Sequence, residues 1–141
     1  MVPNETHGRY HHGDLRNALI QAATTVLVEK SAAALSLREV ARVAGVSHAA
    51  PYRHFRDKAA LLRVLAQGGF ERLTAAINRA AENSPHNPEQ KLIEAGVAYV
   101  RNALQHPEIT RLMFAATIEP PQDRAYLVAS AASYEALLDI I

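Results

Sequence analysis

Polar and basic side chains gather in the segment 36–58, which reads SLREVARVAGVSHAAPYRHFRDK. Ser47 and His48 carry hydrogen-bonding groups that suit base edges, and the Tyr52 hydroxyl is long enough to reach a phosphate. Lys58 stands at an expected helix start, where free amides and a positive charge together favour a phosphate oxygen. The residue types in this segment therefore fit contact with a nucleic acid.

Two short helices would have to position these side chains. Ser36 and Glu39 form the pattern of a capping box, which predicts a helix that begins there and runs to about Ala44. Gly45 suits the left-handed residue that ends a helix, and Ser47 is a favourable N-cap for a second helix.

The second helix is predicted from His48 to about Phe55, with the Phe55 ring packed inward. Pro51 lacks an amide hydrogen and crowds the preceding turn, so its position is uncomfortable in a helix interior. If Ser47 is the cap, Pro51 falls at the end of the first turn. If the helix starts later, Pro51 is one of its first residues.

Two capped helices joined by a glycine turn form the pattern of a helix-turn-helix, in which the second helix enters the major groove. The alternative is a plain helical hairpin, since short capped helices are common. The charge distribution favours the first interpretation. Residues 1–70 hold nine Lys and Arg against five Asp and Glu, whereas residues 71–141 hold six against nine. A basic N-terminal half fits a polyanionic partner, although ordinary surface variation produces similar imbalances.

The rest of the 141-residue chain also has helical periodicity, and no segment alternates like a strand. Asp57 should cap a long helix in which the pair Gly68-Gly69 predicts a bend or close packing. The expected helices besides the two short ones are 14–29, 58–81, 88–105, 108–116 and one that starts near 122 or 123. The fold class is therefore all-α. A three-helix DNA-binding domain would be joined by a long helix to a second helical domain.

The stretch LSLREVARVAGVSHAAPYRHFRDKAALL resembles the DNA-binding domain of the TetR/AcrR family of bacterial regulators, and RYHHGDLRNALIQAATTVLVE resembles the first helix of one branch of that family. The resemblance covers about residues 9–75. It implies a cytoplasmic, sequence-specific transcriptional regulator, most often a repressor that a small-molecule effector releases from duplex operator DNA. It also implies a homodimer. The residues that would contact DNA are Arg38, Arg42, Ser47, His48, Ala50, Pro51, Tyr52, His54 and Lys58.

The resemblance divides the chain into an arm at 1–13, a DNA-binding head at 14–57 and a helical regulatory body at 58–141. Family members carry further helices after the point where this chain ends, and the apolar end at 135–141 agrees with a body that continues or packs on something else. The aromatic and methionine side chains of the body would line an effector pocket or simply fill its core; they are Tyr99, Met113, Phe114, Tyr126 and Tyr134.

Other functions have less support in the sequence. Catalytic motifs are lacking, no cofactor is implied, and the chain has no cysteine. His7, His11 and His12 suggest either a metal site or a basic arm on DNA, and the arm is favoured because no partner stands at ligand spacing. No apolar run approaches the ~20 residues of a membrane span. The remaining alternative is a helical adaptor that no longer binds DNA, which would not need the basic set around Tyr52.

Overall fold

The computed structural model describes residues 12–115 and 123–141, and all regular structure in these two ranges is helical. Its elements are α1 (His12–Lys30), α2 (Leu37–Ala44), the 3-10 helix η1 (Ala50–Arg53), α3 (Lys58–Glu82), α4 (Pro88–Gln105), α5 (Pro107–Met113) and α6 (Arg124–Leu138). The all-α class is confirmed, and the predicted helices lie within a few residues of their expected bounds. No helix in the described ranges is long and apolar enough to cross a membrane.

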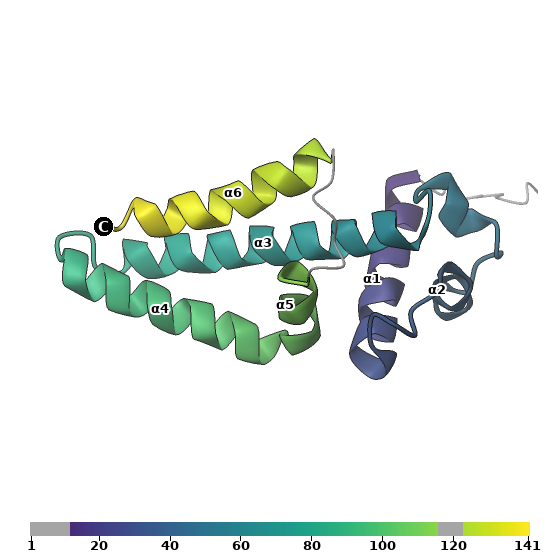
Figure 1. Cartoon of the computed structure of the whole chain (residues 1–141), viewed down its shortest axis with the longest axis horizontal. Helices are drawn as coiled ribbons and strands as arrows, with labels where there is room; N and C mark the ends of the chain where they lie inside the picture. Colours follow the sequence, from purple (N-terminus) through teal and green to yellow (C-terminus); the bar gives the residue numbers. More distant parts are fainter. Residues whose placement is uncertain (1–11, 116–122) are drawn as a thin grey trace, which may run out of the picture.

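The long helix α3 is the axis of the molecule (Figure 1). At one end it packs against α1, and α2 and η1 complete the head there. Further along, α4 and α6 flank α3 on opposite sides, and α5 lies between α4 and the head. Asp57 caps the start of α3 by accepting a 2.8 Å hydrogen bond from the amide of Ala60, as its sequence position predicts.

The core runs without interruption from head to body. Leu19 and Val26 of α1, Val40 of α2 and Leu61 of α3 are fully buried in the head, and Ile77 is fully buried in the body. Apolar residues at helical spacing therefore face the core in both halves.

The pair Gly68-Gly69 serves close packing. A Cβ atom on Gly69 would lie 2.6 Å from Ile109 Cγ2 and 2.6 Å from Met113 Sδ, whereas a Cβ on Gly68 would meet nothing within 4 Å. Helix α3 remains one helix through the pair. Of the two alternatives, bend or close packing, the structure realises close packing at Gly69, because α5 crosses α3 there.

The prediction for the second helix of the helix-turn-helix was wrong in type and in capping. An α-helix from His48 capped by Ser47 was expected, but the structure has the four-residue η1, preceded by Ala49 with no side-chain cap. The reason is Pro51, which has no amide hydrogen to donate to the Ser47 carbonyl. The amide of Ala50 donates to that carbonyl instead, at 3.0 Å. The later start anticipated for Pro51 is the one observed.

Candidate nucleic-acid interface

The turn between α2 and η1 projects polar side chains into solvent. Gly45 ends α2 in the left-handed conformation with φ 70°, and its amide reaches back to the carbonyls of Ala41 and Arg42. The chain can then reverse, so that Ser47 and His48 are exposed ahead of η1. This confirms the predicted role of Gly45, whose φ only glycine adopts without strain.

Tyr52 and Arg53 extend the exposed surface along η1. Tyr52 is 62% exposed, although the two residues before it in η1 are buried in the core. Arg38 of α2 is exposed as well. Together these residues present a phenol hydroxyl, two guanidinium groups and the polar groups of the preceding turn. These groups can donate hydrogen bonds to phosphate oxygens and to acceptors on base edges.

Two of the residues expected to contact DNA are instead buried. Ala50 is 6% exposed, and Pro51 is among the fully buried side chains. Their side chains therefore hold η1 on the core and do not present a surface to a partner. The physical reason is again the short 3-10 helix, whose inner side is formed by these two residues. Phe55 packs inward as predicted, and the guanidinium carbon of Arg16 lies 5.5 Å from the centre of its ring.

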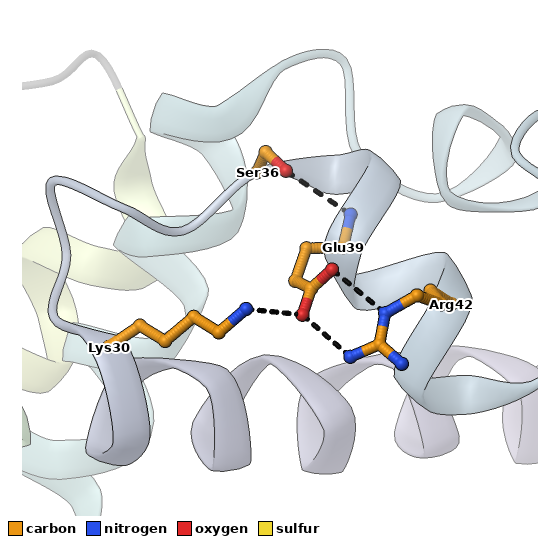
Figure 2. Close-up of polar contacts among 4 residues, drawn as sticks. All are labelled: Lys30, Ser36, Glu39 and Arg42. Atoms are coloured by element: carbon orange, nitrogen blue, oxygen red, sulfur yellow. Dashed lines mark hydrogen bonds and ion pairs between the residues drawn. The ribbon is translucent and has the colours of Figure 1, made fainter.

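A carboxylate bridges α1 and α2 (Figure 2). Glu39 accepts hydrogen bonds from Lys30 Nζ at 2.7 Å and from Nε and Nη2 of Arg42 at 2.9 and 2.8 Å. Ser36 accepts from the Glu39 amide at 3.2 Å, which is the first half of the predicted capping box. The predicted second half, from Glu39 back to the amide of Ser36, does not form, because the Glu39 carboxylate binds the two cations instead.

The electrostatics of this bridge are strong for a surface site. The hydrogen bonds from Arg42 and then Lys30 lower the pKa of Glu39 to about 2. Arg42 thus uses part of its guanidinium to hold α2, while its side chain remains largely exposed. Its expected position beside the DNA backbone remains a prediction.

Lys58 and His54 lie at the base of the same surface. Lys58 Nζ donates to the carbonyl of Ala33 at 3.0 Å and so ties the start of α3 to the loop between α1 and α2. His54 is half-buried at the end of η1, with its ring 6.3 Å from that of Phe55. Contact of either residue with DNA remains a prediction.

The body contains a cavity of about 350 Å³ between α3, α4, α5 and α6. All five residues considered as pocket-lining candidates contribute to it, namely Tyr99, Met113, Phe114, Tyr126 and Tyr134. The sequence missed Phe70 of α3, which makes edge-to-face contacts with Phe114 and Tyr126 at 5.8 Å each. The predicted residues thus meet around one cavity.

Histidines do not assemble into a metal site in the part of the chain that the structure describes, where no group of three or more His, Asp or Glu side chains is placed to hold an ion. His7 and His11 lie outside the described residues, and so does most of the predicted arm. The contribution of this arm to binding remains a prediction from the sequence.

Residues 19–65 match the family model described as bacterial regulatory proteins, tetR family. A solved protein of unknown function from Rhodococcus sp. RHA1 is 42% identical, with a TM-score of 0.82; the match covers 95% of this chain and 69% of that one. The chain belongs to the TetR family. The TetR family transcriptional regulator PfmR from Thermus thermophilus has the same fold, with a TM-score of 0.69 and 23% identity over 86% of this chain and 67% of PfmR.

A TetR family transcription regulator from Marinobacter aquaeolei VT8 also shares the fold, with a TM-score of 0.69 and 20% identity. That match covers 89% of this chain and 65% of the other, so the chain spans about two thirds of the length of these solved proteins. As a TetR-family protein with a helix-turn-helix, the chain is a DNA-binding transcriptional regulator. TetR-family regulators bind operator DNA and typically act as dimers.

Proposed function

We propose that the chain is a repressor that binds duplex operator DNA through the exposed face of α2, η1 and the turn between them. The observation that carries this proposal is the outward projection of Tyr52, Arg53 and His48 from a segment whose apolar residues anchor it to the core. The proposed contacts are Arg38, Arg42, Ser47, His48, Tyr52, Arg53, His54 and Lys58. Ala50 and Pro51 are omitted because they are buried.

The proposed division of labour follows from chemistry. Tyr52, Arg38 and Lys58 would bind phosphates, which positions the head without reading sequence. Ser47 and His48 precede η1 and would meet base edges in the major groove. Residues 14–57 would then form the DNA-binding head, residues 58–141 the regulatory body, and residues 1–13 an arm along the duplex.

Two matched substitutions test the phosphate contacts. Tyr52→Phe removes only a hydroxyl and Arg38→Ala only an exposed cation, so both should weaken binding to every duplex alike. For Arg38→Ala, the slope of log affinity against log salt concentration should also fall by about one unit. Arg124→Ala is the control, because Arg124 is exposed on α6, outside the proposed interface. If the control alters the slope as much as Arg38→Ala, the effect is one of net charge and the assignment is wrong.

His48→Ala tests base reading separately. It should change the preferred sequence more than the salt slope, because a base-edge contact is specific to a position in the site. Selection from random duplexes with the original chain and the variant would measure this. If the original chain and the variant select identical sequences, His48 does not contact base edges.

If the chain is instead a helical adaptor, we expect the opposite result for DNA binding. A helical adaptor would bind duplex DNA weakly, without preference, and Tyr52→Phe would change nothing. Selection of the chain against random duplexes, with the oligomeric state followed by light scattering, separates the two. Enrichment of a palindrome bound by a dimer, with half-sites about 34–36 Å apart or a multiple of that, supports the regulator.

We further propose that the aromatic cavity takes a small apolar effector whose binding releases the DNA. Its support is the placement of Phe70 on α3, the helix that begins directly after the head. A screen of small aromatic compounds by thermal shift should find a ligand that raises the melting temperature and weakens DNA binding. Ser130→Leu, which fills the cavity, should abolish both effects, whereas Ala131→Leu on the exposed side of α6 should not. A ligand that stabilises both variants equally binds elsewhere.

A further inference from the structure

A second concavity lies between α3 and α4, and it reaches the junction of α4 with α5. It encloses about 560 Å³, and none of its lining residues belongs to the aromatic cavity. Arg72 and Arg79 line it from α3, and Arg101 lines it from α4. Arg72 and Arg79 are seven residues apart, so they lie on one face of α3 about two turns from each other.

The three guanidinium groups have little opposing charge. Among the described residues that line the concavity, Glu82 is the only acidic one. The ion pairs found within residues 12–115 and 123–141 join Lys30 and Arg42 to Glu39, Arg63 to Asp123 and Arg111 to Glu108, and they involve none of these three arginines. All three residues are exposed, and an anion that entered the concavity would be attracted by the positive charges lining it.

Neutral polar groups and a histidine complete the lining. Asn102 is a buried amide at the α4 side, with Asn83 and Gln105 nearby. His106, at the junction of α4 and α5, has its pKa lowered first by burial and then by the positive charge of Arg72. The imidazole therefore experiences the field of the guanidinium directly.

We propose that this arginine groove (Arg72, Arg79, Arg101 and His106) is a binding site for a small polyanion that carries phosphate groups. Guanidinium groups bind phosphate through two parallel hydrogen bonds, and two or three of them on facing helices can hold separate anionic groups of one ligand. The groove is not a second DNA contact of the head, because Arg79 lies 21 residues beyond Lys58 along α3, or roughly 32 Å at 1.5 Å per residue. The proposal does not depend on the function proposed above.

Calorimetric titration of the full chain with inorganic pyrophosphate tests the site. We expect saturable binding with a dissociation constant below about 1 mM. Arg72→Gln and Arg101→Gln should each weaken it at least about tenfold, since each removes one charge-assisted contact from a different helix. Arg124→Gln removes the same charge from the exposed surface of α6 and should leave binding unchanged. No saturable binding, or equal weakening by Arg124→Gln, would overturn the proposal.

The DNA-binding head is the competing site for pyrophosphate, and two measurements distinguish it. Arg38→Ala should leave pyrophosphate affinity intact if the groove is the site. By NMR, the imidazole signals of His106 should move on addition of pyrophosphate and its pKa should rise, because a nearby anion favours the imidazolium. Movement of His48 alone, with loss of binding in Arg38→Ala, would place the anion in the head and refute the groove.

Discussion

At the scale of single residues, the Glu39 carboxyl has the largest pKa shift in the described part of the chain. Its carboxylate joins the end of α1 to α2 through Lys30 and Arg42, and its pKa falls from 4.5 to about 2. A carboxyl group whose pKa is lower in the folded state stabilises the fold above its unfolded pKa. That contribution is lost as the pH falls from about 4.5 towards 2.

Glu39→Gln should therefore lower the melting temperature at neutral pH and have a progressively smaller effect as the pH falls to about 2. The measurement is a series of thermal melts of both proteins between pH 2 and pH 7. Glu135→Gln serves as the control, because Glu135 is exposed on α6 and forms no ion pair within the described residues. A difference between Glu39→Gln and the original chain that is independent of pH would contradict the assigned role.

The same bridge bears on DNA binding. Because Glu39 holds part of the Arg42 guanidinium, the substitution frees a cation at the proposed interface while loosening α2. The two effects oppose each other in affinity. Stability and DNA affinity should therefore be measured on the same variant before Arg42 is assigned a phosphate.

At the scale of elements, the crossing of α3 and α5 depends on one of two adjacent glycines. Gly69→Ala should destabilise the fold by about 1–3 kcal/mol, because its Cβ would overlap Ile109 and Met113. Gly68→Ala should stabilise it by up to about 1 kcal/mol, since that position is open and alanine favours the helix. Urea denaturation of the two variants measures both. Equal changes in the free energy of unfolding for the two variants would show that α3 and α5 are less tightly packed at Gly69 than these distances imply.

His106, at the junction of α4 and α5, should make the stability of the fold depend on pH near neutrality. Burial and Arg72 lower the pKa of His106, so the unfolded chain takes up the proton more readily than the folded one. Stability should therefore decrease as the pH falls through about 6.5. His106→Asn keeps a polar residue at the start of α5 and should reduce this dependence. Thermal melts between pH 5 and pH 8 would show it, and an unchanged pH dependence in the variant would exclude His106 as its source.

At the scale of the whole molecule, α3 couples head and body. Leu27 and Ala32 of the head face Leu112 and Ala115 of the body across a shallow concavity, and α3 contributes to the core on both sides. We therefore expect the proposed head and body to unfold in one cooperative transition, although they would act as separate functional units.

Two single-tryptophan variants can test this, because the chain has no tryptophan. Tyr52→Trp reports on the head and Tyr134→Trp on the body, and both side chains are more than 60% exposed, so the substitutions need little room. Their fluorescence transitions in urea should coincide with the loss of helical circular dichroism. Two separate midpoints would mean that head and body fold independently.

The helices and their ends were largely predictable from the sequence, because each depends on residues close together in the chain. Asp57 caps α3, Asn87 caps α4 and Gly45 ends α2 through hydrogen bonds that span only a few residues. Apolar spacing likewise identified the buried faces, since periodicity is a local property. The type of η1 was missed because the effect of Pro51 depends on whether the core accepts its ring, and the core does so by burying Ala50 and Pro51 together.

Only the tertiary structure decided which side chains meet. The binding of Glu39 by Lys30, the close approach of Gly69 to α5, and the gathering of Arg72, Arg79 and Arg101 in one groove all join residues on different helices. Helical periodicity shows which face of a helix is buried, but not which helix covers it or at what height along the axis. The sequence alone therefore determined the α-helices, the ends of α2 and the start of α3, and the family of this protein. Packing of α4, α5 and α6 around α3 determined its cavities and its charged groove, because those depend on distances between segments far apart in the chain.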